Sequence, residues 1–511
     1  MTDHPNAGTP TFLKTIRQPT QAFSVAVYLI AGIALIPFFR YQVNTDGISY
    51  LSIAEKYLQG NFRDAVNGYW APLLSWLLAP ALIIVRDRFL AMRIVSLFIG
   101  LFTLIVFMHA ARVFRLKGWI RRAISLAVIP PILYYANIQF TSDLLLAGMF
   151  LLYVTLVMDS RYLEDPRRAA LVGMSAAFCY FAKHYALPLL ILHLTVASLA
   201  HLSLKPITKV FRNFGISFML FLCVSSCWVG VLSIRYGQLT ISTAGAYNMA
   251  SIGPSRPPYP MDKGRLVPPP NQTARSIWEE PSQAGYPPAW SPLKSTKSFI
   301  YEIRLCLTNL WLIVRYLHDF TIFASMIVAG YVVLLFKRRQ SWIVQPLLAL
   351  LIYPAGYVLV RVEPRYLWPM SMIMFLMAGY LLSIVTRKRS FVAIVILSFV
   401  ALPTLHLARA RNLNADIHAT SLQLHDAGVS GKLASNGNWN GTLYLTEYLD
   451  CSYYGYTDER SMTDLDQQLK KYGIDYFIAW ETISPTLRDY LSQYPVAATL
   501  KEPKLKAFKL H

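Results

Sequence analysis

The chain has 511 residues, of which 55% are hydrophobic and only 15% are charged, and its formal net charge at pH 7 is +21. This composition excludes an ordinary soluble globular protein and indicates repeated membrane spans. The positive charge does not require a nucleic-acid partner, because Lys and Arg accumulate in the cytoplasmic loops of membrane proteins.

The apolar runs are separated by short charged or proline-containing loops and predict about eleven membrane helices. No small-residue cleavage site follows the first run, so we expect it to be retained as a span. Some runs are shorter than the ~20 residues that a full crossing prefers. In chain order, the predicted spans are 22–39, 91–111, 123–137, 144–158, 169–182, 185–201, 213–236, 318–336, 342–360, 366–385 and 391–408.

Clusters of Lys and Arg give the orientation of these spans. Short loops rich in these residues stay on the cytoplasmic side, and such a basic face also suits contact with anionic membrane lipid. If the N-terminus is cytoplasmic and the spans alternate in direction, five basic loops all lie on the cytoplasmic side. These loops are 111–122, 161–168, 205–212, 337–339 and 387–389.

The first outer loop carries Asp46 directly after the first span, in "NTDGISYLSIAEKYLQG". Residues 47–59 have an amphipathic pattern. The following "GYWAPLLSWLLAP" contains Tyr69 and Trp70 and an apolar run too short to cross a membrane. We expect this loop to fold back as two helices that lie along the outer membrane surface.

The same orientation places other ionisable residues on the outer side, where charges at membrane level are candidates for function. Asp143 lies in "NIQFTSDLL", and Lys183 and His184 lie in "YFAKHYALP". The stretch "RVEPRYLWP" supplies a further set of candidates: Arg361, Glu363, Arg365 and Tyr366.

Each candidate also has a structural interpretation. Asp46 and Asp143 both stand where a helix is expected to begin, and an Asp side chain there can cap the first turn. Lys183 and His184 can extend from a helix end toward the interface. Arg361 and Arg365 can anchor the chain at the membrane surface beside aromatic residues.

Two longer regions lie outside the spans. The outer loop 237–299 is rich in proline, so it is either an irregular loop or a lid whose Trp278, Tyr286 and Trp290 stack on a carbohydrate. After residue 408 the chain becomes polar, with a helical pattern and short strands such as "DYFIAW". Residues 409–511 therefore predict a small soluble α/β domain on the outer side, and 1–408 the membrane domain.

The layout of these motifs resembles the GT-C superfamily of membrane glycosyltransferases, in particular protein O-mannosyltransferases and bacterial lipid A aminoarabinose transferases. In that branch an Asp follows the first span, as Asp46 does, and a second acid begins the fourth span, as Asp143 does. An Arg-Tyr-x-x-Pro signature starts a late helix, as "PRYLWP" does. The fold implied is an all-α polytopic membrane protein with juxtamembrane helices, followed by the soluble domain.

The resemblance implies transfer of a sugar from a polyprenyl-phosphate donor to a hydroxyl of a glycan, lipid or protein acceptor, with inversion, at the outer leaflet. The retained spans and the lack of an obvious secretory signal favour a bacterial plasma membrane, and an endoplasmic reticulum origin stays open. Asp46 is then the general base, and Arg365, with Arg361 or Lys183, binds the donor phosphate. Asp143 orients the acceptor or shares a metal ion.

His184 is the expected hydrogen-bond partner in this site, and Glu363, Tyr69, Trp70 and Tyr366 are further site residues. Asp46 is followed by Gly47 where the family often has a second acid, so a divalent cation on Asp46 and Asp143 stays open. Two other functions stay open as well. One is a flippase for lipid-linked sugars, and the other is an outer-leaflet ligase that uses a diphosphate donor.

Overall fold

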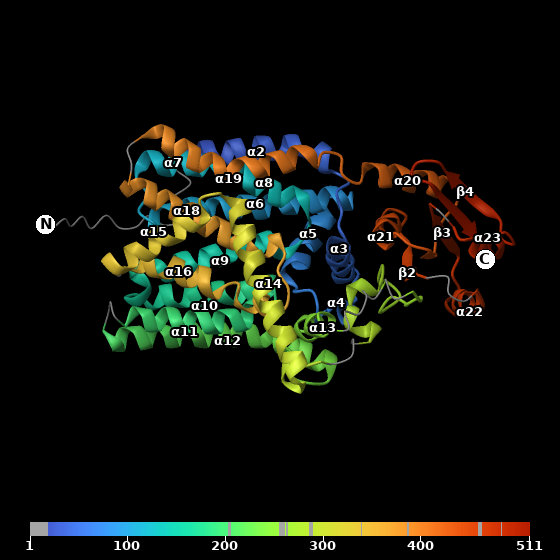
Figure 1. Cartoon of the computed structure of the whole chain (residues 1–511), viewed down its shortest axis with the longest axis horizontal. Coiled ribbons are helices and arrows are strands. Elements are labelled where there is room, and N and C mark those ends of the chain that lie inside the picture. The colour runs from blue at the N-terminus through green and yellow to red at the C-terminus, as the bar shows by residue number, and fades with distance from the viewer. Residues whose placement is uncertain are drawn as a thin grey trace.

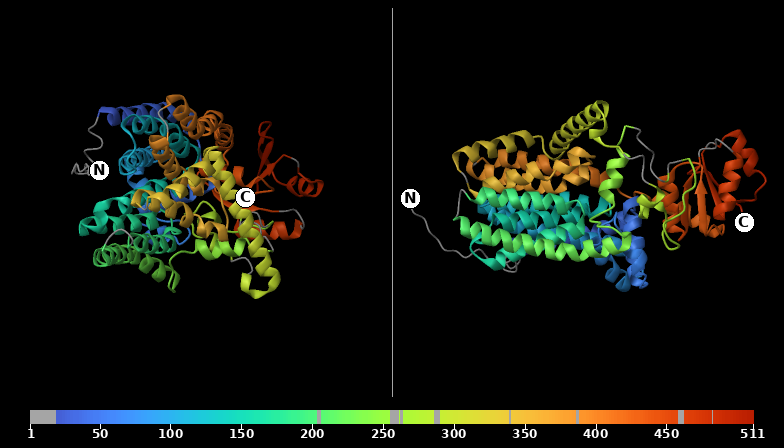
Figure 2. Two further views of the ribbon diagram at one scale, coloured as in Figure 1. Left: turned by 60° about the vertical axis from the view of Figure 1, so that its left-hand side comes forward. Right: turned by 90° about the horizontal axis from the view of Figure 1, so that it is seen from below.

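The computed structural model describes residues 19–202, 206–254, 261, 264–285, 290–338, 340–385, 388–457, 462–481 and 483–511. Most helices form an elongated bundle, and a small domain with a β-sheet sits at one end of it (Figure 1). Figure 2 shows the same two parts from other sides. The arrangement confirms the predicted fold class, a helical membrane bundle followed by a small α/β unit.

The predicted number of spans is not confirmed. Among the described residues, six helices are long and apolar enough to cross a membrane, and the bent pair of α14 and α15 makes seven if it is one span. The bundle helices are α2 (Pro19–Phe39), α6 (Arg88–Val113), α7 (Gly118–Ala127), α8 (Ile129–Ile138), α9 (Ser142–Met158), α10 (Pro166–Ala182), α11 (Ala186–His201), α12 (Ile207–Tyr236), α14 (Thr296–Phe320), α15 (Ala324–Lys337), α16 (Ser341–Ile352), α17 (Ala355–Leu359), α18 (Trp368–Val385) and α19 (Arg389–Arg409).

Proline interrupts two of the predicted spans. Segment 123–137 is divided between α7 and α8, and Pro130 and Pro131 lie in the first turn of α8. Segment 342–360 is divided between α16 and α17, with Pro354 at the break. Proline has no backbone N–H and its ring clashes with the preceding turn, so a helix tends to end before it.

The predicted span 318–336 has a different structure from the one expected. Its first residues belong to α14, which ends at Phe320, and the rest to α15, which begins at Ala324. The two helices meet at 100°. A hydropathy pattern detects the apolar residues on both sides of this bend, but it does not indicate that the chain changes direction between them.

Small residues allow close packing inside the bundle. Gly173 of α10 faces α12 so closely that an added Cβ would lie 2.4 Å from the carbonyl oxygen of Ser217. The hydroxyl of Ser217 in turn donates a hydrogen bond of 2.8 Å to the carbonyl of Ala169. Close backbone approach of this kind is a common way in which helices associate in membranes.

The loop after the first span forms helices, as predicted. They are α3 (Thr45–Leu58), the short α4 (Phe62–Ala65) and α5 (Leu73–Ile84). α3 lies across the end of the bundle that faces the C-terminal sheet (Figure 1), and it packs against α5. The hydroxyl of Ser75 on α5 donates a 2.9 Å hydrogen bond to the carbonyl of Tyr50 on α3.

The C-terminal part is a five-stranded sheet with the strand order β2-β1-β3-β5-β4. β1 pairs in parallel with β2 and β3, whereas β5 pairs antiparallel with β3 and β4. The predicted "DYFIAW" strand is the buried central strand β3. The elements are α20 (Ala415–Asp426), β1 (Lys432–Ser435), α21 (Trp439–Tyr448), β2 (Ser452–Tyr456), α22 (Met462–Tyr472), β3 (Tyr476–Trp480), α23 (Pro485–Leu491), β4 (Val496–Leu500) and β5 (Leu505–Lys509).

The bundle and the C-terminal sheet share buried contacts. Helix α21 packs against α3, and one continuous cluster of buried hydrophobic residues includes Leu433 and Leu443 together with residues of the bundle. The boundary between residues 408 and 409 stays a prediction, because this core continues across it.

Candidate active site

Two acidic side chains stand at helix starts that the fold brings together. Asp46 is the second residue of α3 and Asp143 the second residue of α9. The segments before these helices are joined by a 2.9 Å hydrogen bond from the backbone N–H of Phe140 to the side-chain oxygen of Asn44. The partial positive charge of a helix N-terminus favours a carboxylate at both positions.

Gly47 makes this close approach possible. A Cβ at this position would lie 2.9 Å from the side-chain oxygen of Asn44 and 3.1 Å from the carbonyl oxygen of Phe140. A larger residue after Asp46 would therefore push the two helix starts apart. The absence of a second acid at position 47 has a steric reason here.

The Asp46 carboxylate makes long-range contacts. One oxygen accepts a 3.1 Å hydrogen bond from the indole N–H of Trp278, and the other lies 2.6 Å from the guanidinium of Arg365. Asp46 is 7% exposed. Both of these partners come from segments far from α3 in the chain, so the carboxylate points into the site. Within α3 itself, the Thr45 hydroxyl also donates to the carboxylate, at 3.4 Å.

Arg365 lies between the acids. Its position is set by the 3-10 helix η6 (Pro364–Leu367), which leads into α18. Its Nε lies 2.9 Å from the carboxylate of Glu363 and 3.6 Å from that of Asp143. A planar guanidinium presents several N–H groups in fixed directions, so one side chain can serve three carboxylates at once.

Lys183 supplies a second cation. It follows the end of α10 in an extended conformation, and its ammonium lies 2.5 Å from the carboxylate of Asp143. The same ammonium sits 4.0 Å from the centre of the Tyr366 ring. The two acids and the two cations therefore form one cluster, in which each acid has a cationic partner.

His184 also faces this region but has a different partner. Its Nε2 accepts a 3.2 Å hydrogen bond from the indole N–H of Trp228. Burial lowers the pKa of His184 to about 3, so its ring is neutral at pH 7. The structure places His184 beside the cluster rather than in contact with either acid.

The cluster opens into a cavity of about 530 Å³. All of the site residues expected from the sequence line it, and they include Asp46 and Arg365, which are 319 residues apart in the chain. Arg361 sits at the more open part, with a side chain that is 54% exposed and 3.1 Å from Glu363. The expected residues are Asp46, Tyr69, Trp70, Asp143, Lys183, His184, Arg361, Glu363, Arg365 and Tyr366.

Aromatic residues line much of the same cavity, and the sequence indicated only part of them. Tyr69 and Trp70 pack edge to face, with ring centroids 4.8 Å apart, and Trp278 packs within 6.3 Å of Trp70. Trp278 belongs to the proline-rich loop, where the alternatives of lid and irregular loop were open. Trp290 does not line this cavity, and Tyr286 lies outside the described residues.

Other lining residues were missed because they are ordinary in the sequence. Helix α13 (Ala244–Ser251) contributes Tyr247 and Asn248, and the Asn248 side chain accepts a 3.1 Å hydrogen bond from the hydroxyl of Tyr69. Tyr357 stacks on Tyr366 with ring centroids 4.8 Å apart. No charge or motif marks these positions in the sequence.

The residues present do not fit a divalent cation on Asp46 and Asp143. Such an ion would have to displace Arg365, which contacts both carboxylates. Among the described residues, no group of three or more His, Cys, Asp or Glu side chains is arranged to hold a metal ion.

No protein-family model and no curated protein matches the chain, but its fold is similar to several solved structures. ArnT from Cupriavidus metallidurans bound to undecaprenyl phosphate is 12% identical, with a TM-score of 0.59 over 95% of this chain and 97% of ArnT. Its apo form is 14% identical, with a TM-score of 0.58 over 95% and 98%.

A second similar structure is the oligosaccharyltransferase AglB from Archaeoglobus fulgidus, in complex with an inhibitory peptide and a dolichol-phosphate. It is 9% identical, with a TM-score of 0.55 over 90% of this chain and 69% of AglB. ArnT and AglB are both membrane glycosyltransferases of the GT-C superfamily. The likeness confirms, at the level of the fold, the resemblance expected from the sequence.

Proposed function

We propose that this chain, which has the GT-C fold, is a membrane glycosyltransferase that moves a sugar from a polyprenyl-phosphate donor to an acceptor hydroxyl. The observation that carries the proposal is the cavity itself, in which two carboxylates and two cations meet beside aromatic and apolar walls. Similar structures that hold undecaprenyl phosphate and dolichol-phosphate support a lipid-phosphate donor.

The donor phosphate binds Arg365 and Lys183. Both cations are held by carboxylates in this structure, at 2.6 Å and 2.5 Å, so an entering phosphate competes for them. Guanidinium offers a phosphate two parallel N–H donors and the ammonium offers a point charge. The apolar part of the cavity, which includes Pro188, Ile252 and Val360, takes the beginning of the lipid chain.

Asp46 acts as the general base. When Arg365 turns to the phosphate, the carboxylate oxygen that it held becomes free to accept the proton of the acceptor hydroxyl. The acceptor oxygen forms a bond to the anomeric carbon from one face while the bond from that carbon to the phosphate oxygen breaks on the other. Polyprenyl phosphate leaves with its charge stabilised by Arg365 and Lys183, and the product has inverted configuration.

Asp143 orients the acceptor or holds Lys183 in place. Its position at 2.5 Å from the ammonium and 3.6 Å from Arg365 supports such a role. The described residues of the five basic loops lie at the other end of the bundle from the acidic site (Figure 1). This supports a site and a C-terminal domain outside the cytoplasm.

Release of free polyprenyl phosphate tests the proposal. The purified chain is placed in liposomes with a membrane lipid extract as the source of donor and acceptor, and free polyprenyl phosphate is followed by mass spectrometry. We expect release by the wild type and at least about a hundredfold less by D46N, the usual range for loss of a general base. Binding of polyprenyl phosphate without any release, in both proteins, would instead support a flippase. Release of the diphosphate would support the ligase.

A further inference from the structure

One segment of the outer loop joins the C-terminal domain to the active site. We call residues 264–285 the linking segment. Its first half runs beside the edge strand β2: the N–H of Val267 donates to the carbonyl of Tyr454, and the N–H of Tyr453 donates to the carbonyl of Arg275, both at 2.7 Å. In this way the linking segment lies along the outer side of β2, at the edge of the C-terminal sheet.

The second half of the linking segment is fixed to the membrane bundle by two buried acids. Glu279 forms an ion pair with Lys56 of α3, and their side chains are 3% and 1% exposed. Glu280 accepts hydrogen bonds from the hydroxyls of Tyr236 at 2.7 Å and Thr243 at 3.1 Å. Each contact joins the linking segment to a different element, so its path past α3 is closely defined.

Trp278 lies immediately before these two acids and reaches Asp46. Its indole N–H donates the 3.1 Å hydrogen bond to the carboxylate. Its carbonyl accepts a 3.2 Å hydrogen bond from the indole of Trp70. An indole can only donate, and Trp278 and Arg365 bind different oxygens of the carboxylate, so the Trp278 contact does not compete with Arg365.

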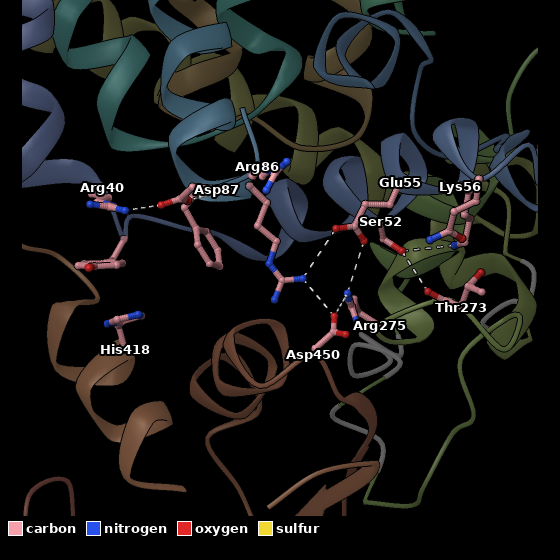
Figure 3. Close-up of a pocket in the computed structure, with 14 residues that line it drawn as sticks. Arg40, Ser52, Glu55, Lys56, Arg86, Asp87, Thr273, Arg275, His418 and Asp450 are labelled. Atoms are coloured by element: carbon pink, nitrogen blue, oxygen red, sulfur yellow. Dashed lines mark hydrogen bonds and ion pairs between the residues drawn. The ribbon is translucent and has the colours of Figure 1, made fainter. Parts of the chain in front are cut away.

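An ion-pair cluster attaches the linking segment to the C-terminal domain (Figure 3). Arg275 lies 3.3 Å from Glu447 of α21 and 3.4 Å from Glu55 of α3, and it also pairs with Asp450. Arg88 lies 3.2 Å from Glu447 and 3.1 Å from Asp450. The Glu447 side chain is completely buried. The cluster therefore ties together three parts of the chain.

The cluster borders an open pocket of about 800 Å³ between α3 and the C-terminal domain. The charges around this pocket are mostly satisfied by one another, since Arg40 pairs with Asp87 and Lys56 with Glu279. This pairing favours a structural clamp over a site for an anionic ligand.

We propose that Trp278 is a positioning residue for Asp46, and that the C-terminal domain holds it there through Arg275 and Glu447. The proposal rests on the role of Asp46 given above. It assigns a purpose to the C-terminal domain that is independent of the acceptor: the domain keeps the linking segment against α3, so that the catalytic carboxylate has one orientation.

W278F tests the contact to Asp46, because it keeps an aromatic ring but removes the N–H donor together with part of the indole ring. We expect the turnover rate to fall about tenfold, the effect of one lost hydrogen bond, with the KM for donor within about twofold of wild type. W290F is the matched control. Trp290 belongs to the same outer loop and donates a 2.7 Å hydrogen bond to the carbonyl of Met249, so the same substitution there should leave turnover unchanged. Wild-type turnover in W278F would overturn the proposal.

E447Q tests the attachment to the C-terminal domain without relying on sugar transfer. We expect backbone amide exchange in residues 264–285 to rise at least about fivefold, because the neutral amide no longer pairs with Arg275. D466N is the control, since Asp466 pairs with Lys470 on an exposed face of α22 at 2.7 Å. If E447Q does not fold, D450N removes the other partner of Arg275 in the C-terminal domain, whose side chain is 70% exposed.

The outcomes separate this inference from the proposed function. Exchange that is unchanged in E447Q and D450N would refute the clamp, whatever the rates of transfer. Normal transfer by D46N would refute the role of Asp46, whatever the exchange of the linking segment.

Discussion

Replacing Arg365 with alanine removes the cation that joins three carboxylates of the site. Its guanidinium lies 2.6 Å from Asp46, 2.9 Å from Glu363 and 3.6 Å from Asp143. If the donor phosphate takes two of these N–H donors, each charge-assisted hydrogen bond contributes about 1.5 kcal/mol or more. The loss of both is then about 3 kcal/mol, which lowers kcat/KM for the donor at least about a hundredfold.

R365K keeps the charge but not the planar fork. An ammonium at this position reaches one phosphate oxygen as a point charge, so we expect it to restore about half of the lost free energy, which leaves a deficit of about tenfold. R361A is the matched control. Arg361 also pairs with Glu363, but its side chain is 54% exposed, and exposed pairs contribute little. We expect it to change kcat/KM less than about threefold.

The assay measures initial rates of polyprenyl phosphate release at several donor concentrations, with acceptor held constant and then varied. Removing one partner of a buried ion pair also destabilises a protein, so melting temperatures are recorded, and rates are compared well below the lowest of them. Donor affinity and turnover that are normal in both R365A and R365K would refute the phosphate-binding role and leave Arg365 as an interface anchor.

D46N keeps a side-chain oxygen that can cap a helix, so the general-base role predicts a folded protein with transfer reduced at least about a hundredfold. A capping role instead predicts an almost silent D46N, and a D46A that is less stable by about 1 kcal/mol. A cysteine placed at position 250 or 430 should react with an impermeant reagent in intact cells, and one at position 338 only after permeabilisation; labelling of 338 in intact cells would reverse the orientation. Burial raises the pKa of Glu280, so its contribution to stability is fully present below the ordinary value of about 4.3 and is lost as pH rises through the raised value. E280Q should therefore gain melting temperature relative to the wild type as pH increases above about 4.3, and a difference that does not vary with pH would contradict this.

The charged site residues were accessible from the sequence because charge at membrane level is costly and therefore conspicuous. Asp46, Asp143, Lys183 and Arg365 each interrupt or border an apolar run. Their pairing was not accessible, since it depends on the packing of helices that are far apart in the chain. Arg365 and Asp46 are 319 residues apart, and no local pattern indicates that they touch.

The aromatic contribution of the outer loop was harder to predict for a related reason. A proline-rich sequence has no helical or strand periodicity from which the orientation of a side chain can be predicted, so Trp278 had no predicted neighbour. The contacts that place it are long-range: Glu279 with Lys56, and Glu280 with Tyr236. The same limit applies to the bend between α14 and α15, since a hydropathy pattern does not give the angle of 100° between two helices.

The C-terminal sheet is not a portable module. Its edge strand β2 has the linking segment as its outer neighbour, and the buried Glu447 pairs with Arg88 and Arg275, which come from outside the sheet domain. A fragment cut at residue 409 would expose an unpaired strand edge and an isolated acid, and unpaired edges promote aggregation. A homologue that exchanged this part alone would have to exchange residues 264–285 with it, so we expect the two regions to vary together during evolution although more than a hundred residues separate them in the chain.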